Sequence, residues 1–211
     1  MRLMHGYVVA DHLEEGLVGW ARRFCRNLIR HYSMENFHEL LLNRRSIRKY
    51  TEEKVDPEDV KLILEAALTA PSSKSGRSWQ FVVIEDPEML DHLSKCKPNY
   101  ATSIAKAPLA VVVTADITKS EAWIEDASVA ASFMQLQATA LGLGSCWVEV
   151  RDRYREDGEP AEDYVREALG IPDEFGVLCI VTIGHKNEER RPIDPAKLQW
   201  EKVHIGKWRN E

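Results

Sequence analysis

The chain has 211 residues, a hydrophobic content of 44%, a charged content of 29% and a formal net charge of −6. This composition suits one ordinary α/β domain or two small ones, and its acidic balance argues against a nucleic-acid-binding protein or one held on anionic lipid. The longest charge-free apolar stretch, residues 107–115, is far shorter than the about 18 residues of a membrane span, so we expect no membrane partner.

Residues 1–33 differ in composition from the rest of the chain. They hold five arginines and three acidic residues, and apolar residues recur at helical spacing between Leu17 and Leu28. Charged residues interrupt any apolar region of a secretory signal. The segment is then an amphipathic extension, a membrane-surface helix, or sequence upstream of a true start at Met34. We favour the last and divide the chain into an extension, residues 1–33, and a domain, residues 34–211.

The first predicted element of the domain is a helix that leads into a basic segment. Asn36 can cap this helix, with a glutamate at the capping-box position three residues later. The helix runs into residues 44–49, and if it continues through them, Arg44 and Arg48 share one face.

The rest of the chain alternates helical and strand patterns. Two helices begin at Asp-Pro pairs, with Asp56 and Asp86 as N-caps, and a Ser-, Gly- and Pro-rich loop follows the first. The longest helix candidate runs from Glu121 to Leu141, is rich in alanine and ends at Gly142. Strand patterns occupy residues 79–85, 108–116, 145–150 and 177–184. This alternation indicates an α/β or α+β sheet with helical cover.

Several familiar catalytic patterns are missing from the sequence. It contains no GxxxxGK[ST] phosphate loop, no GxSxG nucleophile elbow and no HExxH zinc motif. Gly142 and Gly144 lead from a helix into a strand, whereas a dinucleotide-binding fingerprint leads from a strand into a helix. The paired carboxylates Glu125 and Asp126 are interpreted as solvated helix surface. The sequence therefore lacks the residue patterns that a hydrolase or a metalloenzyme would need, and we assign no metal ligand.

The four cysteines lack the spacing of a structural site. Cys25, Cys96, Cys146 and Cys179 include no Cys-x-x-Cys pair, so neither a disulfide framework nor a zinc site is indicated. We expect reduced thiols in a cytoplasmic protein, with Cys146 as a small buried thiol.

One basic cluster stands out in this acidic chain. Arg44, Arg45, Arg48 and Lys49 surround Ser46. Guanidinium groups beside a hydroxyl suit a phosphate, because their paired N–H donors match phosphate oxygens. The alternative is that the basic side chains complement the dipole at the end of a helix.

A second basic cluster follows the last predicted strand. It consists of Lys186, Arg190 and Arg191. Two such clusters suggest one bound anion that is held from both ends of the chain.

Five motifs in a fixed order resemble the nitroreductase family of FMN-dependent oxidoreductases. They are RRSIRKY, AALTAPSSKSGRSWQFVVIED, APLAVVV, WIEDASVAA followed by LGLGSCWVEV, and IGHK followed by RRP. The resemblance extends from about residue 35 to about residue 208. It implies a nitroreductase-like α+β fold with a central, mostly antiparallel sheet covered by helices. It also implies a homodimer with FMN bound at the subunit interface.

The resemblance, carried over position by position, implies which residues hold FMN. Arg44 and Ser46 would hold the phosphate and ribityl end, with Arg45 beside them, and Arg48 would reach the N1/O2 edge of the ring.

Other matched positions lie on two further stretches. Pro71, Ser72 and Ser73 match the family loop that reaches the flavin from the second subunit. Gly144 and Ser145 match the stretch that lies against the ring.

The loop also departs from the family pattern. The family often has Asn-x-Gln-Pro-Trp, whereas residues 75–79 read SGRSW, so Arg77 is the candidate for a replaced contact to the polar edge of the ring. Trp79 is expected to be a core aromatic that opens a strand. Arg190 and Arg191 match the basic pair that closes on the phosphate.

The resemblance implies an NAD(P)H-dependent oxidoreductase. We expect NADH or NADPH to give a hydride to flavin N5, and an electron-poor nitroaromatic, quinone or similar acceptor to take the electrons, in a ping-pong mechanism. No side chain is expected as a catalytic residue, because flavin N5 carries the chemistry. One alternative is an FMN-binding carrier or redox-sensing module without turnover. Another is a colourless interaction protein that uses the alanine-rich helix.

Overall fold

The computed structural model describes residues 37–99 and 101–208. The expected division at residue 33 and the expected cap at Asn36 therefore lie outside the described residues. The residues from His38 onward form one unit. Within the described residues, no helix combines the length and apolar character that crossing a membrane requires.

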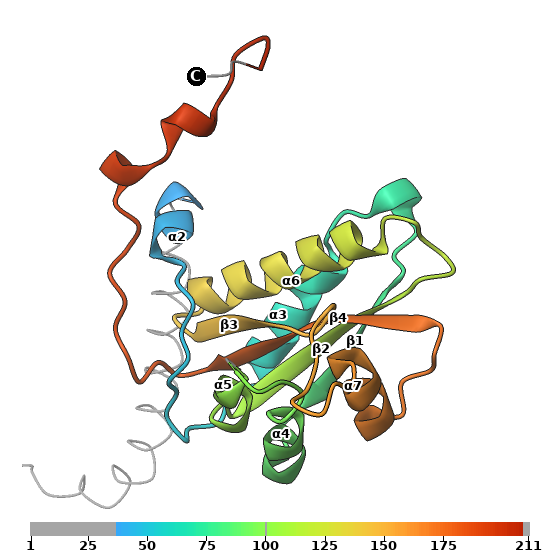
Figure 1. Cartoon of the computed structure of the whole chain (residues 1–211). Coiled ribbons are helices and arrows are strands. Elements are labelled where there is room, and N and C mark those ends of the chain that lie inside the picture. Colours follow the sequence, from blue (N-terminus) through green and yellow to red (C-terminus); the bar gives the residue numbers. More distant parts are fainter. Residues whose placement is uncertain (1–36, 100, 209–211) are drawn as a thin grey trace, which may run out of the picture. The chain divides into compact units, whose positions relative to one another are not determined.

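A four-stranded antiparallel sheet lies at the centre of this unit (Figure 1). Its strands are β1 (Trp79–Ile84), β2 (Leu109–Asp116), β3 (Gly144–Glu149) and β4 (Phe175–Gly184). The order across the sheet is β1-β2-β4-β3, and each pairing is antiparallel. The predicted α+β class with an antiparallel sheet is confirmed.

Helices cover both faces of the sheet (Figure 1). α3 (Pro57–Leu68) and α6 (Trp123–Ala140) pack on one face, and α4 (Pro87–Leu93), α5 (Thr102–Ala105) and α7 (Ala161–Leu169) on the other. Successive side chains of a strand point to opposite faces, so β2 contributes to both cores and is buried along its whole length. A strand covered on both faces was predicted there and is confirmed.

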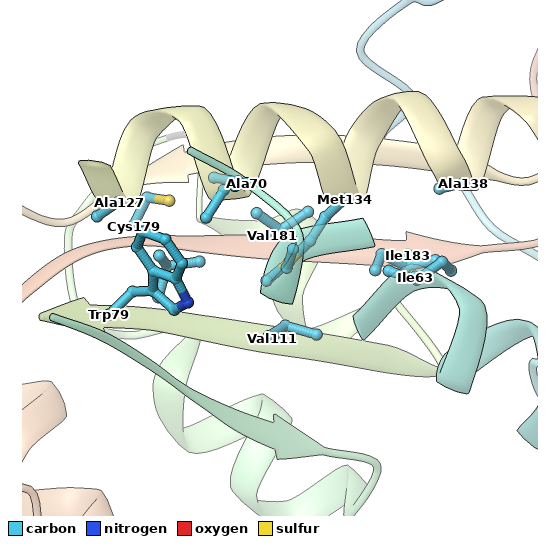
Figure 2. Packing of buried hydrophobic residues seen from close by; sticks show 14 of the residues in the cluster. Ile63, Ala70, Trp79, Val111, Ala127, Met134, Ala138, Cys179, Val181 and Ile183 are labelled. Atoms are coloured by element: carbon cyan, nitrogen blue, oxygen red, sulfur yellow. The ribbon is translucent and has the colours of Figure 1, made fainter. Parts of the chain in front are cut away.

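The core beneath α3 and α6 joins these helices to the sheet (Figure 2). Ile63 of α3 and Met134 of α6 meet Val111 and Val181 of the strands, and all four are buried. Burying a side chain of this size stabilises the fold by about 1.5–3 kcal/mol. Trp79, which is 5% exposed, also packs here, which confirms its interpretation as a core aromatic.

The end of α6 fixes where β3 begins. Gly142 has a φ of +80°, a conformation that glycine adopts without steric cost. Its N–H donates to Thr139 O at 3.0 Å, and the Leu143 N–H donates to Ala138 O at 2.8 Å. This pair of bonds closes the helix, as the sequence predicted, and turns the chain directly into Gly144 and β3.

Candidate functional site

The predicted helix is present, but it ends before the arginine cluster and does not run into it. α2 (Phe37–Asn43) stops immediately before Arg44, whose N–H donates to Leu40 O at 3.0 Å. The dipole at the C-terminus of α2 can act on Arg44, which follows the helix directly, but it does not account for Arg48, which lies on the extended stretch beyond. Arg44 and Arg48 therefore share no helix face.

The residues after α2 form an extended stretch, the arginine segment (residues 44–50), which lies beside the start of β3. Ser46 bridges Ser145 in parallel register, and the Ile47 N–H donates to Ser145 O at 2.9 Å. A Cβ atom on Gly144 would lie 2.7 Å from Ile47 Cγ2. Only glycine therefore allows the arginine segment to approach β3 this closely.

The tail segment (residues 185–193), which follows β4, runs antiparallel to the arginine segment. Backbone hydrogen bonds connect Thr51 N–H to His185 O at 3.0 Å, Asn187 N–H to Lys49 O at 3.0 Å, and Ile193 N–H to Leu42 O at 2.8 Å. The Arg45 Nη1 donates to Arg191 O at 3.0 Å. The two basic clusters, which are far apart in the sequence, therefore lie side by side.

A carboxylate that the sequence analysis did not single out lies between the two clusters. Glu188 Oε1 accepts from the main-chain N–H groups of Arg48 at 2.6 Å and Lys49 at 3.2 Å, and Oε2 lies 2.9 Å from Arg190 Nη2. The hydrogen bond from the Arg48 N–H and the nearby Arg190 charge hold the pKa of Glu188 below its usual value, despite the opposing effect of burial. In the sequence, Glu188 is marked only by its position as an acidic residue between Lys186 and Arg190 of the second basic cluster.

The two segments and the end of α6 enclose a cleft of about 630 Å³. Its walls include Arg45 and Ile47 from the arginine segment, Thr139 from α6, and Lys186 and Arg190 from the tail segment. A volume of this size suits a small organic cofactor or substrate.

Part of the hydrogen-bonding capacity of the arginine segment and of the start of β3 is unused within the described residues. The guanidinium groups of Arg44 and Arg48 make no ion pair or hydrogen bond there. Ser145 is 1% exposed, and its buried Oγ has no hydrogen-bond partner in the part of the chain that the structure describes. A buried polar atom without a partner costs about 1–3 kcal/mol. These groups fit an anionic ligand that carries further polar atoms, as FMN does.

The loop at residues 71–77 lies elsewhere, at the first turn of α6. The Ser73 N–H donates to Asp126 Oδ1 at 2.7 Å, and Ser120 Oγ lies 3.1 Å from Asp126 Oδ2. Asp126 is 5% exposed, so the interpretation of this carboxylate as solvated surface is wrong, whereas Glu125 is exposed. Asp126 anchors the loop, a role that the sequence analysis missed.

The same loop has an unusual backbone. Lys74, Ser75 and Arg77 have φ values of 51°, 54° and 47°, a region that non-glycine residues seldom occupy. The Arg77 N–H donates to Ser72 Oγ at 3.0 Å, which closes the loop on itself. Strained backbone of this kind is concentrated at functional sites.

Within one chain, this loop and the cleft do not meet. α6 has 18 residues, with the loop bound to Asp126 in its first turn and the cleft lined by Thr139 in its last. At about 1.5 Å per residue, the helix separates the two regions by roughly 20 Å. The structure thus brings together the expected residues of the arginine segment, β3 and the tail segment. It leaves apart Pro71, Ser72, Ser73 and Arg77.

Comparison with known proteins gives one consistent family. The model of the nitroreductase family matches residues 41–96 and 93–185. An FMN-dependent nitroreductase from Clostridium difficile R20291 superposes with a TM-score of 0.79 and 46% identity, covering 81% of this chain and 99% of that one. An Archaeoglobus fulgidus protein named NADH dehydrogenase/NAD(P)H nitroreductase is 33% identical over 180 residues, which cover 83% of this chain and 100% of that protein. The FMN reductase (NADPH) of Bacillus subtilis is 26% identical over 196 residues, covering 82% of this chain and 72% of that protein.

Proposed function

This chain belongs to the nitroreductase family, and from that premise we propose how its residues hold a flavin and which acceptors it reduces. It is an NAD(P)H-dependent flavin oxidoreductase with FMN as its cofactor. The proposed acceptor is an electron-poor compound such as a nitroaromatic or a quinone. When bound, FMN supplies the redox chemistry at N5, with hydride arriving from NADH or NADPH and electrons leaving to the acceptor in ping-pong order.

The antiparallel pairing of the arginine and tail segments is the observation that carries the proposal. It brings residues 44–46 alongside the segment that carries Arg190 and Arg191, which supports a phosphate bound by guanidinium groups from both segments. In the proposed site, these five residues hold the phosphate and ribityl end of FMN.

The ring of FMN would lie toward the start of β3. In the proposed site Gly144 and Ser145 would lie against the ring, and the buried Ser145 Oγ, which has no partner within the described residues, supports a polar contact there. Arg48 extends from the adjacent strand-like segment and is proposed to lie at the N1/O2 edge. Its positive charge would stabilise negative charge that develops at this edge on reduction.

We propose that a second copy of the chain completes the site. Pro71, Ser72 and Ser73 match the family loop that reaches the flavin from the second subunit, and Arg77 of the same loop is the candidate for a replaced contact. The loop is bound at the first turn of α6, away from the cleft of its own chain. The tail beyond residue 194 also exposes large apolar side chains that a partner surface would cover. These are Trp200, Val203, Ile205 and Trp208, which are 70%, 58%, 85% and 77% exposed.

Purification of the native protein tests the cofactor assignment. The protein is expected to be yellow, and denaturation should release FMN and not FAD. The basic side chains suit the terminal phosphate of FMN, and no sequence element indicates a site for the second nucleotide of FAD. A colourless protein that cannot be loaded with FMN would refute the assignment. We place the enzyme in the cytoplasm, where three buried free thiols, Cys96, Cys146 and Cys179, would stay reduced, and cell fractionation tests this location.

Turnover separates an enzyme from a flavin carrier or redox sensor. Steady oxidation of NADH or NADPH is expected when menadione or a nitroaromatic is added, and double-reciprocal plots at several acceptor concentrations should be parallel. Intersecting lines would refute the ping-pong order alone. A yellow protein without turnover would favour the carrier or sensor.

A further inference from the structure

Glu188 places a negative charge in a cleft that is proposed to bind an anion, where a carboxylate is unexpected. It lines the cleft, and its side chain is only 13% exposed. Two consecutive main-chain N–H groups, those of Arg48 and Lys49, converge on one of its oxygens, and the guanidinium of Arg190 contacts the other. This single side chain therefore connects the arginine segment to the tail segment.

These contacts have a geometric consequence for both arginines. The bonds to the main chain fix the peptide orientation at Arg48 and Lys49, and so the direction in which the Arg48 side chain leaves the backbone. The ion pair uses one nitrogen of the Arg190 guanidinium, whose remaining N–H donors stay available to a ligand in the cleft. An arginine ordered before binding loses less conformational entropy when the ligand arrives.

We infer that Glu188 is a positioning residue of the flavin site, which orients Arg48 and Arg190 toward FMN. The inference rests on the proposed function and concerns a residue outside the expected phosphate ligands. A purely electrostatic effect of Glu188 would have the opposite sign, because a carboxylate near a phosphate repels it. Removal of the charge alone would strengthen FMN binding, whereas loss of positioning would weaken it. Whether FMN binding weakens or strengthens when Glu188 is replaced therefore decides between positioning and simple charge repulsion.

The test compares three variants of the holoprotein by the release of FMN on dilution, followed by flavin fluorescence. Glu188→Gln keeps an oxygen for the two main-chain N–H groups but loses the ion pair with Arg190. Glu188→Ala loses both contacts. Glu189→Gln is the matched control, because Glu189 is exposed, lines the same cleft and makes no hydrogen bond or ion pair within the described residues.

The dissociation constant of FMN is expected to rise about tenfold or more in Glu188→Ala and by a smaller factor in Glu188→Gln. In Glu189→Gln it should stay the same or fall, because only repulsion is removed. The near-isosteric Glu188→Gln variant carries the test if Glu188→Ala does not fold. Glu188 variants that match Glu189→Gln, or that bind FMN more tightly than wild type, would overturn the inference.

Two further measurements distinguish positioning from a structural role. In an Arg190→Ala background, Glu188→Gln should add little further loss of FMN affinity, because its partner is already absent. Glu188→Ala should also lower the flavin midpoint potential through displacement of Arg48, while Glu188→Gln leaves it nearly unchanged. Full additivity in the double variant, with unchanged potentials, would mean that Glu188 only stabilises the fold. A wild-type protein that binds no FMN would instead refute the proposed function itself.

Discussion

Arg48 lies on an extended segment and not on a continuation of α2. Its main chain is held by Glu188, and its exposed side chain is without an ion pair in the described part of the chain. A cation at the N1/O2 edge would stabilise reduced FMN more than oxidised FMN, because reduction leaves negative charge near N1. Such a difference sets the reduction potential.

Replacement of Arg48 by alanine should lower the flavin midpoint potential. A hydrogen bond to a charged group contributes about 1.5–3 kcal/mol, and about 1.4 kcal/mol corresponds to about 30 mV for a two-electron couple, which gives a decrease of roughly 30–65 mV. The full range applies when the whole interaction arises on reduction. Potentiometric titration of the FMN-loaded variant measures it.

Lys49→Ala is the matched control for this measurement. It removes the same charge from the next position, and the main chain at Lys49 keeps its hydrogen bond to Glu188. The control should retain a potential close to that of wild type. If both variants shift equally, the effect comes from net charge, and if Arg48→Ala binds FMN with an unchanged potential, Arg48 does not lie at the ring.

Gly144 controls how closely the arginine segment approaches β3. In Gly144→Ala the new Cβ would lie 2.7 Å from Ile47 Cγ2 and 2.8 Å from Ile47 Cβ, so the segment must move. We expect a loss of about 1–3 kcal/mol in the free energy of unfolding, together with weaker FMN binding. Denaturant unfolding and FMN titration provide the two measurements.

Gly142→Ala gives the comparison for that result. Nothing lies within 4 Å of its added Cβ, but its φ of +80° strains any other residue, which costs about 1–2 kcal/mol. This variant should lose stability and keep FMN affinity. An equal loss of FMN affinity in both variants would mean that general destabilisation, and not displacement of the arginine segment, weakens the site.

At the level of elements, local signals in the sequence predicted most of the framework. Asp56 and Asp86 cap α3 and α4 as expected, because an Asp-Pro pair restricts the chain to a helix start. Gly142 ends α6 for an equally local reason. α5 was missed, since its four residues are too few to show a helical period.

The parts of the site that could not be predicted depend on long-range pairing. Nothing local shows that α2 ends at Asn43, because the following residues are held by β3 and the tail segment. Glu188 and Asp126 resemble ordinary surface acids in the sequence. Each becomes a structural acceptor only when main-chain N–H groups from a segment 53 or 140 residues away reach it.

Asp126 makes a testable contribution to the loop at residues 71–77. Asp126→Asn keeps one carbonyl oxygen but replaces the other acceptor with an amide donor, so either the Ser73 N–H or the Ser120 hydroxyl loses its acceptor. We expect a loss of about 1–3 kcal/mol in the free energy of unfolding and faster amide exchange in the loop. Hydrogen exchange read by mass spectrometry checks the second effect. Glu125→Gln, at an exposed position, should change neither, and slow exchange retained in Asp126→Asn would contradict the anchoring role.

At the scale of the whole molecule, the alanines of α6 are used inside the subunit. Ala127, Ala130, Ala131 and Ala138 are fully buried in the core between α3, α6 and the sheet. Figure 2 labels Ala127 and Ala138 among them. The small-residue pattern of α6 therefore supports its packing within one chain and is not needed to explain a dimer. The stronger arguments for a second copy are the separation of the loop from the cleft and the exposed apolar tail.

The proposed dimer, in which each subunit completes the flavin site of the other, would couple assembly to cofactor binding. We expect sedimentation of the native protein to show a dimer at micromolar concentration.

Truncation after Arg191 would remove part of the pairing with α2, whereas truncation after Asp194 keeps the Ile193 bond to Leu42 and removes the exposed apolar residues. The protein truncated after Asp194 should dissociate toward monomers and bind FMN more weakly, because the partner's loop leaves the cleft. A fourfold variant that changes Trp200, Val203, Ile205 and Trp208 to serine controls for chain length and should behave in the same way. A native monomer that binds FMN tightly would refute the shared site, and a stable dimer of the truncated protein would assign the interface to surfaces other than the tail.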